Sequence, residues 1–161
     1  MTFNLRLIQA QDNEPLECII RTVLAEYGAD RPGFAWQDPE LSALSKAYNA
    51  PGHAYWVVSQ GTQLLGGVGI APLKPTVVHT CELQKMYLSP VARGQGLGQL
   101  LLHTALEFAQ QHYQWCYLET LTNMTDAAML YRRAGFMALP TPIISTEHGG
   151  CDCWFLKELG A

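Results

Sequence analysis

The stretch that decides the fold runs from Met86 to Leu100 and reads Met-Tyr-Leu-Ser-Pro-Val-Ala-Arg-Gly-Gln-Gly-Leu-Gly-Gln-Leu. A β-prone segment ends near Leu88, a short loop follows, and glycines then alternate at 94, 96 and 98. Residues 97–109 have the apolar spacing of a helix. Glycines at a helix start let a ligand approach the backbone closely, where the first N–H groups lack helical partners. Because the helix dipole is positive there, this stretch predicts an anion site, best suited to phosphate.

Length and composition predict a single globular domain over residues 1–161. Of the 161 residues, 48% are hydrophobic and 15% are charged, which is typical of a folded domain with a real core. The net charge of −4 argues against a nucleic-acid partner. The longest unbroken run of apolar residues and glycine, residues 64–71, is far shorter than the roughly 20 residues that span a bilayer. The charged N-terminal segment does not resemble a signal peptide. We therefore expect a cytoplasmic protein with no membrane partner.

The cysteines and histidines do not form a metal-binding pattern. The five cysteines are scattered and contain no C-x-x-C pair, and the five histidines lack ligand spacing. We therefore expect buried, reduced thiols and no metal site.

Hydrophobic periodicity and turn residues predict the order of the elements. The expected strands cover residues 3–8, 54–59, 63–71, 77–88, 115–121, 136–139 and 151–159. The expected helices cover residues 13–27, 39–48, 96–112 and 125–133, with Gly135 as the C-terminal cap of the last one. Antiparallel strands come first and helical crossovers follow, so the predicted class is α+β with a mixed sheet and helices on both faces.

Two motifs together carry a resemblance to a known family. Arg93-Gly94-Gln95-Gly96-Leu97-Gly98 fits Arg/Gln-x-x-Gly-x-Gly/Ala between a strand and a helix. About thirty residues later, Ala127-x-x-Leu130-Tyr131-x-x-x-Gly135-Phe136 fits Ala-x-x-Leu-Tyr-x-x-x-Gly-Phe. The pair resembles the GNAT superfamily of acyl-CoA-dependent N-acetyltransferases over essentially the whole chain. The resemblance implies a GNAT-like, mostly antiparallel central sheet of about seven strands.

The resemblance also implies acetyl-CoA as cosubstrate and a set of residues that bind it. The CoA pyrophosphate would lie on the backbone amides of Arg93, Gly94, Gln95, Gly96, Leu97, Gly98 and Gln99. The pantetheine arm would pair with the backbone of Met86, Tyr87 and Leu88, with Tyr131 near the thioester sulfur. Many family members have an asparagine seven residues before this tyrosine. Met124 holds that position here, so the expected contact moves to Asn123.

Other phosphate-binding loops fit this stretch less well. A dinucleotide-binding turn requires G-x-G-x-x-G directly after a strand, whereas the spacing here is G-x-G-x-G after four intervening residues. A P-loop requires Gly-Lys-Ser/Thr, which the stretch does not contain.

Acyl transfer from a thioester to an amine suggests three catalytic candidates. The amine must lose a proton, the oxyanion needs a donor, and the leaving thiolate benefits from a proton. Glu82, on the long strand where several GNAT enzymes carry a glutamate, is the expected general base; alternatively it faces solvent and pairs with Lys85. Glu119 is the second candidate and could instead shape the pocket. No dedicated base is needed if the amine arrives neutral. Tyr131 would protonate the thiolate, unless it is only a core aromatic. The resemblance implies a backbone N–H near Met86 for the oxyanion.

The acceptor is predicted only as a primary amine of a small molecule or peptide. Its pocket is expected from residues 26–36, 66–69 and 140–150. The acidic residues Glu26, Asp30 and Asp38 allow a cationic amine. No cysteine lies beside the predicted thioester site in sequence, so direct attack in a ternary complex is expected. The alternatives are an acyl-CoA-binding regulatory module without turnover and a protein-interaction domain. A homodimer is compatible with the resemblance.

Overall fold

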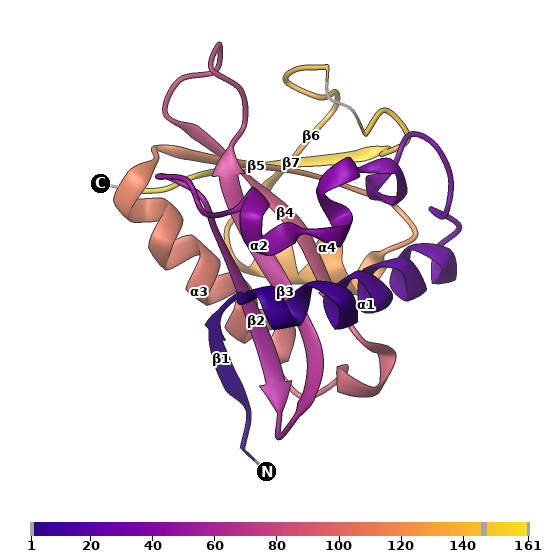
Figure 1. Ribbon diagram of the computed structural model, residues 1–161. Coiled ribbons are helices and arrows are strands. Elements are labelled where there is room, and N and C mark those ends of the chain that lie inside the picture. Colours follow the sequence, from indigo (N-terminus) through magenta and orange to yellow (C-terminus); the bar gives the residue numbers. More distant parts are fainter. Residues whose placement is uncertain (1, 146–147, 161) are drawn as a thin grey trace.

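A seven-stranded sheet forms the centre of the computed structural model, which describes residues 2–145 and 148–160 (Figure 1). The strands, in the sheet order β1-β2-β3-β4-β5-β7-β6, are β1 Asn4–Leu7, β2 Ala54–Gln60, β3 Gln63–Pro72, β4 Thr80–Leu88, β5 Trp115–Thr120, β7 Cys153–Glu158 and β6 Met137–Leu139. The α-helices are α1 Asn13–Glu26, α2 Leu44–Ala47, α3 Leu97–His112 and α4 Thr125–Arg133. Short 3-10 turns are η1 Ala10–Asp12, η2 Ala35–Gln37, η3 Pro39–Ser42 and η4 Pro90–Ala92.

The sheet is mixed and mostly antiparallel. Strands β4 and β5 pair in parallel, and the remaining neighbours pair antiparallel. The parallel pair requires a crossover, which α3 provides. This architecture confirms the predicted α+β class and the predicted order of elements.

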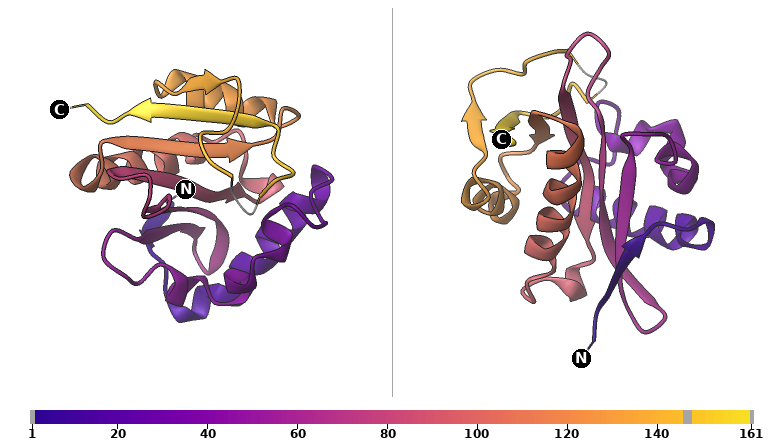
Figure 2. Two further views of the ribbon diagram at one scale, coloured as in Figure 1. Left: turned by 90° about the horizontal axis from the view of Figure 1, so that it is seen from above. Right: turned by 90° about the vertical axis from the view of Figure 1, so that its left-hand side faces the viewer.

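Helices cover both faces of the sheet (Figure 2). Side chains alternate along β2, so Tyr55 and Val57 pack under α1 while Trp56 and Val58 pack under α3. The two faces therefore bury separate cores. The core under α3 extends to α4 and β7, whereas the core under α1 extends through the irregular residues 29–48.

Several predicted boundaries were wrong by a few residues. The helix expected over 39–48 is interrupted at Ala43, whose backbone (φ −144°, ψ 46°) is not helical, so it divides into η3 and α2. The strand expected from residue 77 begins at Thr80, after His79 with a φ of +59°. By contrast, α4 has the predicted bounds, and Gly135 follows it with a φ of +98°, as expected for a C-terminal cap. Among residues 2–145 and 148–160, no helix is long and apolar enough to span a membrane.

Candidate active site

Strands β4 and β5 separate part-way along their length and form a fork. Their parallel register ends where Glu82 faces Tyr117, although β4 continues to Leu88 and β5 continues to Thr120. Beyond this point β5 pairs only with β7 on its other side. The edge of β4 inside the fork can therefore offer its backbone groups to an extended ligand, as the resemblance to the GNAT superfamily implies for pantetheine.

A bulge turns β4 at the mouth of the fork. Gln84 pairs with Gly69 and Tyr87 pairs with Gly67, so the two residues Lys85 and Met86 oppose one residue of β3. Lys85 has a φ of +49°, and its carbonyl accepts a hydrogen bond of 2.7 Å from Tyr55 Oη. The bulge thus lies beside Met86, where a backbone N–H was expected to face the oxyanion.

The glycines of β3 support the bulge. They are not among the described residues that line the two cavities that meet at the fork, which corrects the prediction that residues 66–69 line the acceptor pocket. A Cβ on Gly67 would lie 2.5 Å from Tyr55 Cε1, and one on Gly69 would lie 2.8 Å from ring atoms of Tyr48 and Tyr55. On Gly66 it would lie 2.1 Å from the carbonyl oxygen of Tyr87. These positions need glycine because tyrosine rings and the neighbouring backbone fill the space.

A groove of about 420 Å³ runs from the fork to the start of α3. It is lined by the end of α1, the end of β4, the glycine loop (residues 93–99) and α4: Val23, Tyr27, Met86, Tyr87, Leu88, Arg93, Gly94, Gly96, Gly98, Gln99, Met124, Asp126, Ala127, Met129, Leu130, Tyr131 and Arg133. Gly94 and Gly96 have left-handed φ values of +76° and +80°. An added Cβ on either would meet no neighbour within 4 Å, so the loop is open on that side. The groove thus fits a long ligand with an anionic end at the start of α3.

Most, but not all, of the predicted cofactor residues reach this groove. Leu97 is buried in the core, and Gln95 Nε2 donates to the carbonyl of Val91. These two residues can therefore offer only their backbone amides to a cofactor. Asn123 does not line either cavity in the described part of the chain, and its side chain donates to the carbonyl of Tyr27 at 3.3 Å. Met124, the residue that departs from the family pattern, lines the groove instead.

Arg93 and Glu26 form an ion pair at the edge of the groove. The guanidinium donates two hydrogen bonds to the carboxylate, at 2.7 and 2.8 Å. The guanidinium carbon also lies 5.8 Å from the centre of the Tyr27 ring. Glu26 is therefore engaged by a cation of the glycine loop, which corrects its prediction as an acceptor-binding carboxylate.

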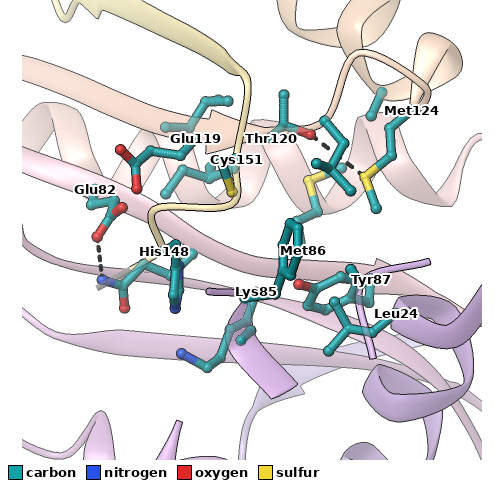
Figure 3. A pocket seen from close by; sticks show the side chains of 18 of the residues that line it. Leu24, Glu82, Lys85, Met86, Tyr87, Glu119, Thr120, Met124, His148 and Cys151 are labelled. Atoms are coloured by element: carbon teal, nitrogen blue, oxygen red, sulfur yellow. Dashed lines mark hydrogen bonds between the residues drawn. The ribbon is translucent and has the colours of Figure 1, made fainter. Parts of the chain in front are cut away.

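A smaller pocket of about 90 Å³ joins the groove at the fork (Figure 3). Residues common to both cavities are Met86, Tyr87, Met124, Ala127 and Tyr131. Glu82 from β4 and Glu119 from β5 point into the pocket from the same side (Figure 3). Glu82 Oε1 accepts a hydrogen bond from Gln84 Nε2 at 2.6 Å, and Glu119 Oε2 accepts one from Tyr117 Oη at 2.9 Å. The structure thus places both predicted carboxylates in one pocket, which Tyr131 also lines.

The environment of Glu82 suits a general base. Burial raises the pKa of its carboxyl above the usual value, the hydrogen bond from Gln84 opposes this shift, and the nearby Glu119 adds to it. A carboxylate whose pKa is nearer to neutral is a better proton acceptor. The alternative pairing of Glu82 with Lys85 was wrong, because Lys85 Nζ lies 2.6 Å from Asp38 Oδ2 and 3.4 Å from Glu40 Oε1.

Tyr131 lies at the junction of groove and pocket as a buried phenol. Its ring centre is 5.8 Å from that of Phe136 and 5.8 Å from that of Phe155, which fixes its position. Burial and the nearby Cys116 raise the pKa of Tyr131 well above the usual value. The phenol therefore keeps its proton at neutral pH and can donate a hydrogen bond.

His148 lies in the predicted 140–150 segment and lines the pocket, although the sequence did not single it out. Its Nε2 lies 3.0 and 3.1 Å from the two carboxylate oxygens of Asp38. Burial disfavours its charged form, but Asp38 outweighs this and raises the pKa of His148. Asp38 is thus held between Lys85 and His148, which corrects its prediction as a site for the amine. Residues 146 and 147 of the predicted 140–150 segment lie outside the described residues.

Cys151 also lines the pocket, which the sequence argument against a cysteine nucleophile did not foresee. Burial, followed by the nearby Glu119 and Glu82, raises the pKa of Cys151 to about 12. Its side chain is therefore a thiol at neutral pH, and a thiol is a poor nucleophile.

Replacing Cys151 by Ser tests this conclusion. We expect turnover to stay within about tenfold of the wild type, because the change is nearly volume-conserving and removes no proton-transfer group. Steady-state release of CoA measures it. A loss of all turnover, together with an acetylated Cys151 in the wild type, would show that the thiol carries the acetyl group.

Comparison with known proteins agrees with this geometry. The model of the acetyltransferase (GNAT) family matches residues 20–136. Uncharacterized N-acetyltransferase YjgM of Escherichia coli (strain K12) is 42% identical over 158 residues, which cover 96% of this chain and 94% of that protein.

Solved structures share the fold. A GNAT-family acetyltransferase from Staphylococcus aureus Mu50 superposes with a TM-score of 0.82 at 19% identity, over 99% of this chain and 100% of that one. YncA from Salmonella typhimurium, solved with its cofactor acetyl-CoA, superposes with a TM-score of 0.80 at 17% identity. The match covers 99% of this chain and 95% of that one. Motifs, fold and family match agree: the chain belongs to the GNAT family of acetyltransferases.

Proposed function

We propose that this protein transfers an acetyl group from acetyl-CoA to a primary amine of a small molecule or peptide, by direct attack in a ternary complex. The observation that supports the proposal best is the junction of the two cavities at Tyr131, with two carboxylates on the pocket side. A donor in the groove and an amine in the pocket would meet there. YncA, which shares the fold, binds acetyl-CoA.

The groove provides the groups that acetyl-CoA requires. The N–H groups of the glycine loop and the start of α3 would hold the pyrophosphate, the fork edge of β4 would pair with pantetheine, and Arg133 on the groove wall would meet a phosphate. When bound, acetyl-CoA supplies an activated thioester. Glu82 would take a proton from the amine, directly or through water, and Glu119 would help to bind the ammonium form. Tyr131 would donate a proton towards the sulfur, and a backbone N–H of the bulge near Met86 would face the oxyanion.

The alternative is a regulatory module that binds acetyl-CoA without turnover. An assay of CoA release over a panel of polyamines, amino acids, aminoglycosides and peptides separates the two. We expect at least one amine to accelerate CoA release and to be recovered in acetylated form. A protein whose melting temperature rises with acetyl-CoA, but which acetylates no amine, would support the module.

Replacing Gly96 by Ala tests the role of the glycine loop. Gly96 has a φ of +80°, so the change strains the backbone and adds a methyl group where the pyrophosphate is expected. We expect the Kd for acetyl-CoA, measured by calorimetry, to rise about tenfold or more, which corresponds to about 1.4 kcal/mol.

Gly61→Ala is the matched control. Gly61, in the turn between β2 and β3, has a φ of +60° and equally open space. The strain should lower its melting temperature similarly without changing the Kd. An unchanged Kd in Gly96→Ala would contradict the assignment of the loop.

A further inference from the structure

We propose that Gln84 and Tyr48 are positioning residues, which hold one carboxylate oxygen of Glu82 and leave the other for the acceptor amine. This inference rests on the proposed function. It arises from a chain of two short hydrogen bonds that ends at Glu82. Tyr48 Oη donates to Gln84 Oε1 at 2.6 Å, and Gln84 Nε2 donates to Glu82 Oε1 at 2.6 Å. The second of these bonds is visible at the edge of the pocket (Figure 3).

The tyrosine and the carboxylate together determine which end of the amide faces Glu82. Glu82 and Gln84 are two residues apart on β4, so their side chains lie on one side of the strand. A glutamine amide has one accepting oxygen and one donating nitrogen. Tyr48 donates to the oxygen, so the nitrogen faces the carboxylate. The opposite orientation would place the amide oxygen against a carboxylate oxygen, two acceptors without a proton between them. Tyr48 therefore acts on Glu82 through Gln84.

Packing fixes the hydroxyl of Tyr48 in space. The residue caps the end of α2, is 6% exposed, and its ring centre lies 5.2 Å from that of Tyr55. Gly69 makes this arrangement possible, because a Cβ there would lie 2.8 Å from both rings. Burial raises the pKa of Tyr48 well above the usual value, so the hydroxyl stays protonated and remains a donor. The same two tyrosines thus support the β4 bulge and the base beside it.

The hydrogen bond from Gln84 favours the ionised form of Glu82, against burial and against the charge of Glu119. Other titratable groups around Glu82 are Lys85 on its own strand, Tyr48 at the end of α2, Cys116 and Tyr117 on β5, and His148 and Cys151 from the segment before β7. Removing the Gln84 bond leaves all of these in place. The carboxyl should then need a higher pH to ionise.

The test compares the pH dependence of kcat/KM in Gln84→Leu, Tyr48→Phe and the double variant. The acidic limb is the part of the profile in which kcat/KM falls as the pH falls. In Gln84→Leu we expect this limb to move up by about one pH unit, because the variant loses one hydrogen bond to a charged group and such a bond changes a pKa by about that much. Tyr48→Phe should shift it less and in the same direction. Because Tyr48 acts through Gln84, the double variant should match Gln84→Leu alone. Tyr113→Phe is the matched control: it loses a hydroxyl that donates to the carbonyl of Gly52 at 2.7 Å, and its limb should not move.

An unmoved limb in Gln84→Leu, additive shifts in the double variant, or an equal shift in Tyr113→Phe would each overturn the proposal. Titration of the Glu82 carboxyl carbon by NMR in isotope-labelled protein measures the same shift without turnover. If no amine is acetylated but the carboxyl titrates higher in Gln84→Leu, the proposed function fails while the positioning role holds. A normal titration in that variant overturns the positioning role even if the enzyme is active.

Discussion

Replacing Glu82 by Gln should lower kcat/KM for an accepted amine about 100-fold or more, the usual contribution of a positioned general base. Gln keeps the shape of the side chain but cannot take a proton from an ammonium whose pKa is about 10. Glu82 lines the pocket and is not among the described residues that line the groove. The Kd for acetyl-CoA, measured by calorimetry, should therefore stay nearly unchanged.

The pH profile identifies the base. A general base acts in its ionised form, so the proposal predicts that kcat/KM falls as the pH falls through the pKa of Glu82. Burial raises the pKa of Glu82, which places this limb above the ordinary glutamate value of about 4.3. Glu119→Gln is the comparison variant from the neighbouring strand. It should retain an acidic limb, moved to lower pH because the charge of Glu119 raises the pKa of Glu82. Full turnover in Glu82→Gln, together with loss of the limb in Glu119→Gln, would assign the base to Glu119 instead.

Replacing Tyr131 by Phe should lower kcat about 100-fold, because the leaving thiolate loses its proton donor. The ring packs between Phe136 and Phe155 and is retained in the variant, so the fold should persist. Steady-state kinetics measures kcat, and a thermal melt checks the fold.

Tyr87→Phe is the control for this change. Tyr87 lines the same junction, but it is expected to contact the donor only through its backbone. Its kcat should fall much less. A Tyr131→Phe variant with wild-type kcat would show that the phenol is only a core aromatic.

The sequence predicted the parts of the fold that depend on local spacing. These parts are the glycine loop, the start of α3 after Gly96 and the cap at Gly135. Each can be predicted from a few adjacent residues, because glycine readily adopts the backbone conformation that the position requires. Most residues predicted to bind the cofactor line the groove, since one loop and one strand end provide them. Met124 lines the groove and Asn123 does not, because a one-residue shift before α4 changes which side chain reaches it.

The pocket could not be predicted in the same way, because distant segments assemble it. His148 binds Asp38, 110 residues earlier in the chain, and Asp38 in turn holds Lys85 at the bulge. No local pattern in the sequence indicates such partners. Glu26 and Asp38 were therefore expected to favour a cationic amine, although each already pairs with a cationic side chain of this chain. Gly69 was likewise expected to line the acceptor pocket as one of residues 66–69, whereas it accommodates the rings of Tyr48 and Tyr55.

The most direct test of the account measures CoA and acetylated product after mixing the protein with acetyl-CoA, first without and then with an accepted amine. Direct transfer predicts no stoichiometric burst of CoA and no acetylated protein without the amine. With the amine present, it predicts equal amounts of CoA and acetylated amine. A burst equal to the protein concentration without amine, with the acetyl group on Cys151, would contradict direct transfer.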